Sequence, residues 1–347
     1  MTAGLPGSDR PLVEAYDLAV LDLDGVVYVG PDAVPGAAES LAKARAAGMA
    51  MAFVTNNASR PPQSVVDHLV RLGVEAHLDD VVTSAQVAAR LLAQRLPAGA
   101  AVLVVGGEGL RLTLQENGLR PVASMDDEPV AVVQGFSPDI GWRLLAEGTR
   151  AVRAGLPWVA TNLDTTFPTP HGPAPGNGAL VGAVAAAAGK RPDDVAGKPA
   201  PGSFHEAARR HHSRRPLVVG DRLDTDLEGA VNAGMDGLVV LTGVSTASDL
   251  VTCGREVRPT HLGRGLWSLH EAHPHVVPGR DGAASGGSRV RAEGDRLVVL
   301  DPGTDALDLL RAGCVAGWTV VDAGRTPDPA DLLAALRALE PGAAWAR

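Results

Sequence analysis

The feature that most constrains the fold of this chain is an apolar run that ends in two carboxylates. Residues Leu18–Leu21 are all apolar and lead directly into Asp22-Leu-Asp24-Gly25. A short, fully apolar run is typical of a strand that is buried on both faces of a parallel sheet. Ligands of such sheets bind outside the carboxyl ends of the strands. The run therefore predicts an α/β protein with two acids at the mouth of a ligand crevice.

Asp22 and Asp24 favour phosphoryl-transfer chemistry. If the strand continues through both acids, their side chains face the same side and can address one bound group. Like charges this close repel each other unless a cation lies between them or one of them takes a proton. The pair therefore suits a magnesium-dependent reaction with one acid as nucleophile and the other as general acid/base. The alternative is a pair of solvated turn acids.

Strand-like and helix-like segments alternate along most of the chain. This alternation predicts a doubly wound, Rossmann-like parallel sheet. Strands are expected near residues 18–21, 49–54, 101–105, 130–134, 158–161, 216–219 and 238–241, with helices between them. Beyond residue 290 we expect a small β-α-β-α appendage, with strands at 296–300 and 318–321 and helices at 305–312 and 328–339.

Four polar elements follow these expected strands or lie in the loops between them. They are Asp22-Leu-Asp24, Thr55-Asn56-Asn57, Lys198-Pro199 and Gly220-Asp221 with its neighbour Asp226. Each one alone is a common turn or surface loop. Together they supply a hydroxyl and backbone amides for phosphate oxygens, a lysine for the transferred group, and further acids for a metal. The combination favours a phosphoryl-transfer site.

The four motifs, in this order and spacing, resemble those of the haloacid-dehalogenase (HAD) superfamily of phosphatases. The resemblance implies that Asp22 is the nucleophile that forms an aspartyl-phosphate. It implies that Asp24 protonates the leaving alkoxide and then activates the hydrolytic water. Thr55 and the backbone amide of Asn56 are implied as phosphate ligands, and Lys198 as the clamp on the nucleophile and the phosphoryl oxygens.

The same resemblance implies a Mg²⁺ site. Its ligands would be Asp22, the backbone carbonyl of Asp24, and Asp221, with Asp226 acting through a water or behind the direct ligands. An acid at the position of Asp24 is typical of the superfamily's phosphatases, whereas its ATPases carry a threonine there. The resemblance therefore implies a phosphatase.

The spacing of the motifs places an inserted cap domain. Only 30 residues separate Asp24 from Thr55, whereas 142 separate Thr55 from Lys198. The insertion is therefore of the second (C2) type, and with segments 82–85 and 241–245 the chain resembles the NagD-like (class IIA) branch. We expect a core of residues 14–83 plus 193–266, a cap of 84–192, a linker of 271–289 rich in Pro, Gly and Ser, and a C-terminal appendage of 290–347 whose role the sequence does not indicate.

Within the cap, residues 160–168 resemble a segment that the branch repeats. Asn162 and Asp164 are therefore candidate substrate contacts. The alternative is a strand-to-loop turn in which these side chains bond neighbouring backbone groups.

Charge and cysteine content limit the partners and the compartment. The formal net charge of −9 argues against nucleic acid or an anionic membrane surface as partner. Cys253 and Cys314 form no disulfide framework, which indicates a reducing cytoplasm. The longest apolar stretch, residues 179–188, is too short to span a bilayer. The sequence leaves the oligomeric state open, a homo-oligomer included.

The sequence thus predicts a magnesium-dependent phosphomonoesterase for a small phosphorylated metabolite. Resemblance to actinobacterial class IIA enzymes favours glycerol 3-phosphate. Phosphoglycolate, sugar phosphates, pyridoxal phosphate and nucleoside monophosphates stay open as substrates, as does phosphoryl transfer to another acceptor. A different class of answer is a non-catalytic regulatory protein that binds a phosphometabolite on the same scaffold.

Overall fold

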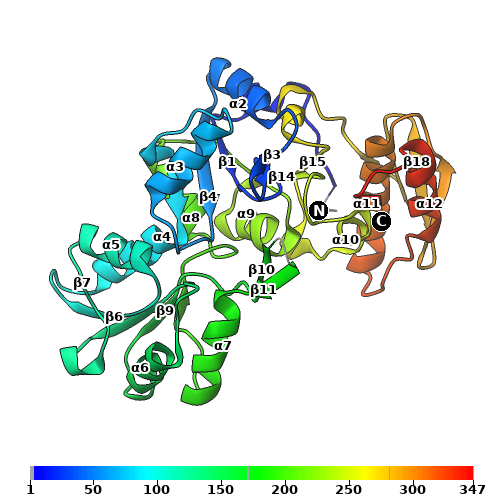
Figure 1. Cartoon of the computed structure of the whole chain (residues 1–347). Helices are drawn as coiled ribbons and strands as arrows, with labels where there is room; N and C mark the ends of the chain where they lie inside the picture. Colours follow the sequence, from blue (N-terminus) through cyan, green and yellow to red (C-terminus); the bar gives the residue numbers. More distant parts are fainter. Residues whose placement is uncertain (1–3, 170–171, 281, 347) are drawn as a thin grey trace. The chain divides into compact units, whose positions relative to one another are not determined.

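The computed structural model describes residues 4–169, 172–280 and 282–346 and divides the chain into two compact units (Figure 1). One unit contains residues 1–51 and 211–347, and the other contains residues 52–210. The chain passes from the first unit to the second within strand β4 (Ala50–Thr55) and returns after helix α8 (Gly202–Arg210). The first unit therefore consists of two separate parts of the sequence.

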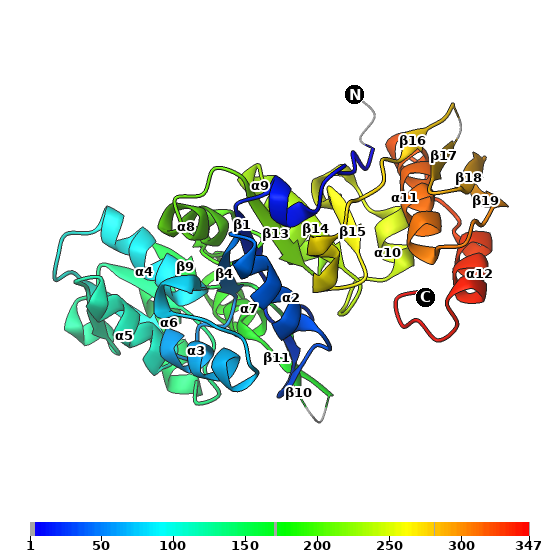
Figure 2. The same ribbon diagram turned by 90° about the horizontal axis from the view of Figure 1, so that it is seen from above.

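The first unit contains parallel strands in the order β15-β14-β13-β1, which lie side by side in Figure 2. All four residues of β1 are buried, as expected for an apolar strand with helices on its faces. The α/β prediction is confirmed. The strands are β1 (Leu18–Leu21), β13 (Pro216–Gly220), β14 (Asp236–Val240) and β15 (His261–Gly263).

Strand β1 ends before the two acids. The amide of Asp22 donates to the carbonyl of Val219 at 2.9 Å, which extends the parallel ladder by one residue. The chain then turns, and Asp24 forms an isolated bridge with Tyr28. The prediction of one pleated strand through Asp22 and Asp24 is therefore wrong: a turn, not strand periodicity, sets the directions of their side chains.

Short elements surround this sheet in the first unit. The helices are α1 (Leu12–Ala15), α2 (Ala37–Ala46), α9 (Glu228–Ala233) and α10 (Ala247–Thr252), and the hairpin is β2 (Tyr28–Val29) with β3 (Asp32–Ala33). Single turns occur at Leu223–Leu227 (a π turn), Arg255–Val257 and Leu266–His270.

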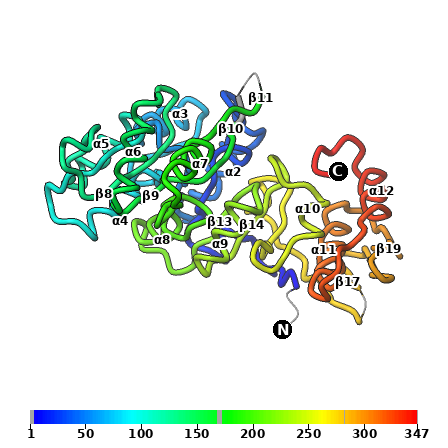
Figure 3. The backbone as a smooth tube through the Cα atoms, turned by 90° about the horizontal axis from the view of Figure 1, so that it is seen from below, coloured from blue at the N-terminus to red at the C-terminus, as the bar shows by residue number. Residues whose placement is uncertain are grey.

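The C-terminal part of the first unit is an antiparallel sheet covered by two helices, α11 and α12, which pack on each other (Figure 3). The segment 271–289, predicted as a linker, carries strands instead. Its small side chains, such as Ala283 and Ser285, are buried in the sheet, and composition alone does not separate such a strand from a linker. The elements are β16 (Val277–Pro278), β17 (Gly282–Ser285), β18 (Ser288–Glu293), β19 (Arg296–Asp301), α11 (Ala306–Asp322) and α12 (Ala330–Leu339).

The predicted strand at 318–321 is also wrong, because these residues lie inside α11. Their β-branched side chains favour a strand in isolation. Most of α11 is buried, however, and burial on nearly all sides outweighs this local preference.

Helix α11 shares one hydrophobic core with the parallel sheet. Trp318 is 1% exposed, its indole N–H donates to the carbonyl of Leu250 at 2.8 Å, and the Arg258 guanidinium lies 5.0 Å from the ring centroid. Leu241 and Ala247, which flank the loop after β14, belong to the same buried cluster as Trp318. The C-terminal sheet and helices are therefore packed as part of the first unit.

The second unit is built on a five-stranded parallel sheet in the order β12-β9-β8-β6-β7. Buried side chains of α4 and α5 pack on one face, and those of α6 and α7 pack on the other. The elements are α4 (Ser84–Arg95), β6 (Ala101–Val105), α5 (Glu108–Glu116), β7 (Arg120–Val122), β8 (Ala131–Gln134), α6 (Trp142–Arg153), β9 (Trp158–Ala160), α7 (Asn177–Ala188) and β12 (Asp194–Val195).

Two smaller pieces complete the second unit. The parallel strands β4 and β5 pair in register from Phe53 opposite Val81 to Thr55 opposite Thr83. A separate antiparallel hairpin follows β9. These elements are β5 (Val81–Thr83), α3 (Pro62–Arg71), β10 (Thr166–Thr169) and β11 (Gly172–Pro175), with single turns at Leu78–Asp80 and Met125–Asp127.

Across residues 4–169, 172–280 and 282–346, every helix is too short or too polar to cross a bilayer.

Candidate active site

Three of the predicted acids come together in the first unit. Carboxylate oxygens of Asp22, Asp221 and Asp226 all lie within 4.8 Å of one another. Asp22 follows β1 and Asp221 follows β13, and because these strands are parallel neighbours their carboxyl ends meet at one edge. Asp226 reaches this edge from the π turn that precedes α9. The topology thus brings together residues about 200 positions apart in the sequence.

Asp221 is held rigidly by the loop after β14. Its Oδ2 accepts the backbone N–H of Val244 at 2.8 Å, and its backbone carbonyl accepts the N–H of Ser245 at 3.0 Å. A Cβ on Gly243 would collide with the Asp221 carboxylate. The loop therefore packs directly on this acid, and a residue larger than glycine at 243 would displace it.

Two further acids, Asp224 and Asp226, follow Asp221 in the chain, but they have different surroundings. Asp226 is 1% exposed, and its Oδ2 accepts the N–H of Arg222 at 3.2 Å. The exposed Asp224 instead makes a bidentate ion pair with the guanidinium of Arg222, at 3.0 and 2.7 Å. Asp226 thus joins the acid cluster, whereas Asp224 is a surface ion pair.

Asp24 does not bring its carboxylate into the cluster. Its side chain is exposed, and only the three other acids share the short carboxylate distances among the residues that the structure describes. The neighbouring Gly25 carbonyl accepts the hydroxyl of Thr242 at 2.6 Å, which fixes the turn. An exposed carboxylate next to the cluster is suited to exchange protons with water, as a general acid/base requires.

The donor set of this cluster fits a hard divalent cation. Three carboxylates this close repel one another unless a cation or a proton offsets their charge. Mg²⁺ is bound by one or two carboxylates together with water and phosphate oxygens. Two of the acids, Asp221 and Asp226, are almost fully buried, which strengthens the repulsion that a cation would relieve.

The second unit gathers the other predicted residues. Thr55 is the last residue of β4, is 7% exposed, and accepts the N–H of Asn57 on its Oγ1 at 3.1 Å. Lys198 is 4% exposed, which is rare for a lysine. The side chain of Asn56 hydrogen-bonds both the backbone N–H and the backbone carbonyl of Lys198.

Asn162 and Asp164 are engaged within the same unit. The Nδ2 of Asn162 donates to the carbonyl of Asn56 at 2.7 Å, and its Oδ1 accepts the N–H of Asp164 at 3.1 Å. The carboxylate of Asp164 accepts from Nδ2 of Asn56 at 3.1 and 3.3 Å. The local turn that was the alternative to substrate contact is thus present at Asn162.

Sequence reasoning missed three polar residues that contact the predicted segments, two in the second unit and one in the first. Ser84 donates its hydroxyl to the carbonyl of Asn56, Asn177 donates to the carbonyl of Asn162, and Thr242 donates to Gly25. Ser84 and Thr242 lie in the two segments that carried the family resemblance, but their contacts are too distant in sequence for spacing to reveal. Asn177 opens α7 and carried no signal.

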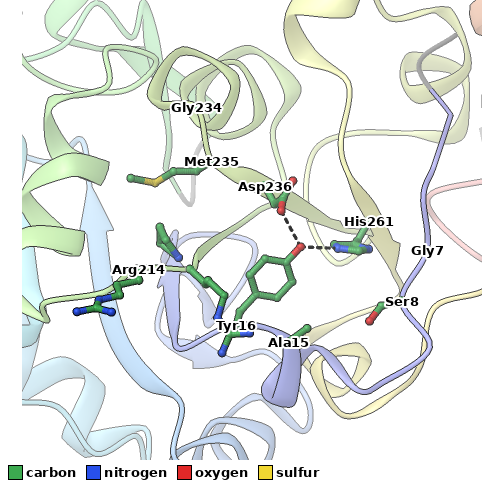
Figure 4. A pocket seen from close by; sticks show the side chains of 11 residues that line it. Gly7, Ser8, Ala15, Tyr16, Arg214, Gly234, Met235, Asp236 and His261 are labelled. Carbon is green, nitrogen blue, oxygen red and sulfur yellow. Dashed lines mark hydrogen bonds between the residues drawn. The ribbon is translucent and has the colours of Figure 1, made fainter. Parts of the chain in front are cut away.

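A cavity of about 430 Å³ lies at the opposite, amino-terminal edge of the first unit's parallel sheet (Figure 4). The hydroxyl of Tyr16 lies 2.9 Å from both the carboxylate of Asp236, to which it donates, and Nε2 of His261. Burial, with the nearby charge of Asp236, raises the pKa of Tyr16, and burial lowers the pKa of His261 to about 4. Both groups are therefore neutral at pH 7, and the cavity lining contains none of the predicted site residues.

The order of the strands, the clustered acids and the buried lysine define a class of protein. Residues 19–120 match the haloacid dehalogenase-like hydrolase family, and residues 195–269 match a second HAD-hydrolase-like family. The chain belongs to the HAD-like hydrolases, as its motifs predicted.

Individual members of this family show high similarity to the chain in sequence and in structure. The chain is 46% identical over 316 residues to the D-glycerol 3-phosphate phosphatase of Mycobacterium tuberculosis, covering 89% of this chain and 88% of the relative. It is 34% identical to the acid sugar phosphatase of Staphylococcus aureus, covering 73% of this chain and 96% of that protein. The crystal structure of the M. tuberculosis glycerol phosphate phosphatase with magnesium superposes with a TM-score of 0.85 at 43% identity, covering 95% of this chain and 99% of that one.

Proposed function

We propose that this protein is a magnesium-dependent phosphomonoesterase whose substrate is glycerol 3-phosphate. The observation that carries the chemistry is the cluster of Asp22, Asp221 and Asp226 at the carboxyl edge of a parallel sheet. The substrate is supported by the similarity to the M. tuberculosis glycerol 3-phosphate phosphatase over nearly the whole of both chains. The magnesium requirement is supported by the oxygen donor set and by the magnesium-bound structure of that relative.

In the proposed reaction, the carboxylate of Asp22 attacks phosphorus and the bond between phosphorus and the glycerol oxygen breaks. Asp24 gives its proton to the departing alkoxide, so glycerol leaves as the neutral alcohol. Asp24 then takes a proton from a water molecule, which attacks the aspartyl-phosphate and releases inorganic phosphate and free Asp22. Bound Mg²⁺ supplies positive charge that offsets the phosphoryl oxygens and the acid cluster.

The remaining residues are proposed to bind and orient the substrate. Thr55 and the backbone amide of Asn56 would donate to phosphate oxygens, and the Lys198 ammonium would offset their charge. Residues 84–192 are proposed as the cap that selects the substrate, with Asn162 and Asp164 in its selective segment. The core would be residues 14–83 with 193–266, and 290–347 an additional C-terminal region.

A phosphate-release assay tests this proposal. With Mg²⁺, the wild type should release phosphate from glycerol 3-phosphate, and a chelator should abolish the activity. Asp22→Asn should lower kcat by about 10⁴-fold or more because it removes the nucleophile. Asp224→Asn, an amide substitution at the surface ion pair, is the matched control and should retain activity. Wild-type turnover in folded Asp22→Asn would rule out the aspartyl-phosphate route.

The same assay separates the alternatives. Phosphoglycolate, sugar phosphates, pyridoxal phosphate and nucleoside monophosphates belong in the panel, and the highest kcat/KM identifies the substrate. Phosphate transfer to an added alcohol that exceeds hydrolysis would indicate a phosphotransferase. Tight ligand binding without any hydrolysis would indicate a regulatory binding protein.

The proposed compartment is the cytoplasm. Cys253 and Cys314 are both free and buried, and burial raises the pKa of Cys253 to about 11. Cysteines without a disulfide are typical of a reducing compartment.

A further inference from the structure

We infer that Asn56 is a positioning residue, whose side-chain carboxamide joins the backbone of Lys198 to the segment that carries Asn162 and Asp164. This inference rests on the proposed phosphatase function. It adds a role for the Asn56 side chain, since the resemblance assigns only its backbone amide to the phosphate.

The carboxamide of Asn56 makes a two-point contact with the backbone of Lys198. Its Oδ1 accepts the Lys198 N–H at 2.8 Å, and its Nδ2 donates to the Lys198 carbonyl at 3.1 Å. One side chain thus bonds both polar backbone groups of a residue 142 positions away in the sequence. This pairing fixes the position and the direction of the main chain from which the lysine side chain starts.

The second N–H of the same amide holds Asp164. The Asp164 carboxylate can only accept, and the Lys198 N–H can only donate, so the orientation of the Asn56 amide is unambiguous. Nδ2 therefore faces Asp164, at 3.1 Å from Oδ2, and Oδ1 faces Lys198. Both polar atoms of the Asn56 side chain are engaged in these contacts.

The backbone carbonyl of Asn56 extends the network. It accepts the Ser84 hydroxyl and the Nδ2 of Asn162, both at 2.7 Å. The Oδ1 of Asn162 in turn accepts the Asp164 N–H, which closes a ring of hydrogen bonds from Asn56 through Asn162 and Asp164 back to Asn56. Rings of this kind rigidify a site because each bond restrains the next.

Gly197 packs closely against the oxygen side of the Asn56 amide. A Cβ on Gly197 would collide with Oδ1 of Asn56 and would lie 2.5 Å from the Thr161 carbonyl oxygen. The Gly197 N–H itself donates to that carbonyl at 2.7 Å. Residues 161, 197 and 56 are therefore in direct contact on the side of the amide that faces Lys198.

This arrangement has a consequence for the proposed reaction. Lys198 is 4% exposed, so the restraint on its backbone also restrains where its ammonium group can lie. A displacement of about 1 Å in a positioning group costs on the order of 100-fold in rate. Asn56 should therefore affect kcat through Lys198.

The Asn56 amide supplies both the acceptor and the donors that this position uses. Aspartate has the same shape and keeps an acceptor for the Lys198 N–H, but it loses both donated hydrogen bonds. It would also place a second carboxylate about 3.1 Å from that of Asp164. Like charges at this distance raise the pKa of one of the pair, and the shared proton would restore a donor.

The test compares Asn56→Asp, Asp164→Asn and the exchange Asn56→Asp/Asp164→Asn, assayed with glycerol 3-phosphate and with p-nitrophenyl phosphate between pH 5 and 9. Asn56→Asp should lower kcat about 100-fold at pH 8, with KM changed less than about threefold. Its deficit should shrink toward pH 5, where the acid pair holds a proton. The exchange should raise kcat at pH 8 about tenfold above that of Asn56→Asp and restore the wild-type pH profile. The reason is that the amide introduced at position 164 then donates to the carboxylate introduced at position 56.

The matched control is Gln86→Glu in α4. The Gln86 side chain acts as an acceptor for the Thr83 N–H at 3.0 Å, so glutamate can replace it. The control adds the same charge to the same unit and should leave kcat, KM and the pH profile unchanged. If Asn56→Asp does not fold, Asp164→Asn alone should lower kcat by a few-fold, since the amide keeps an acceptor for Asn56.

The outcomes separate this inference from the proposed function. If the wild type hydrolyses neither substrate, the proposed function fails. The contact between Asn56 and Asp164 is then tested by thermal unfolding, where the exchange should recover the stability that Asn56→Asp loses. If the wild type is active and folded Asn56→Asp keeps kcat within threefold across the pH range, the inference is overturned. The inference would also be overturned if the effects of Asn56→Asp and Asp164→Asn simply add in the double variant, in both activity and thermal unfolding.

Discussion

The two groups of predicted site residues are organised by opposite physical principles. In the first unit, Asp22, Asp221 and Asp226 bring like charges within 4.8 Å of one another. In the second unit, Asn56 and its neighbours pair donors with acceptors, and the one acid, Asp164, is held by an amide. The first group is incomplete without a cation. The second is joined by a closed ring of hydrogen bonds, which restrains its geometry.

Because of this difference, we expect substitutions in the two groups to change different kinetic properties. Disturbing the acid cluster should change how the protein responds to Mg²⁺, whereas disturbing the Asn56 ring should change turnover at saturating Mg²⁺. Each group contains a glycine at which one added methyl group acts as a probe. Neither glycine has the positive φ that disfavours alanine, so the expected effect of substitution is steric.

The largest effect is expected for Gly243→Ala in the first unit. Its methyl group would collide with the Asp221 carboxylate and push it out of the cluster. The Mg²⁺ concentration for half-maximal activity should rise about 30-fold, in the range typical of lost support for a metal ligand. Activity titrated against Mg²⁺ measures this change. An unchanged titration would show that Asp221 does not hold the metal.

A smaller effect of a different kind is expected for Gly197→Ala in the second unit. Its methyl group would collide with Oδ1 of Asn56 and displace the bond to Lys198. We expect kcat to fall about tenfold, because Lys198, the proposed phosphate-binding lysine, would be displaced. The half-maximal Mg²⁺ concentration should stay within about twofold of the wild type. A shift in Mg²⁺ response as large as that of Gly243→Ala would contradict the separation of the two groups.

The smallest effect is expected for Gly182→Ala, which serves as the control for both probes. Gly182 lies in the exposed face of α7 with open space at its Cβ. Alanine should stabilise the helix by about 0.5–1 kcal/mol, because glycine loses more backbone entropy on folding. Denaturant unfolding measures the gain, and kcat and the Mg²⁺ response should be unchanged. A loss of activity here would show that methyl groups perturb this fold without specificity.

The sequence indicated the acid cluster more directly than the hydrogen-bond ring around Asn56. An apolar run that ends in acids carries its own signal, and strands β1 and β13 place Asp22 and Asp221 at one edge as the alternation implied. The Asn56 ring joins residues from 56 to 198 through amide groups. No local pattern distinguishes an asparagine that bonds a distant backbone from one in an ordinary turn.

The sequence also misjudged elements whose structure depends on distant packing. The expected β-α-β-α alternation placed a strand at 318–321, but α11 is buried on nearly all sides and is a helix throughout these residues. Composition placed a linker at 271–289, where Ala283 and Ser285 are strand residues under that helix. In both cases the conformation depends on packing against elements that are distant in the sequence. A stretch of about ten residues carries no information on that packing.

The shared core around Trp318 couples the acid cluster to the far end of the chain. The loop that grips Asp221 is flanked by Leu241 and Ala247, and both pack in the same core as α11. The Ala247 N–H also donates at 2.8 Å to the carbonyl of Trp345, close to the last described residue. The backbone that holds Asp221, a proposed metal ligand, is therefore supported by residues that carry no motif. A sequence comparison limited to the motifs would treat as dispensable the C-terminal region that packs behind the acid cluster.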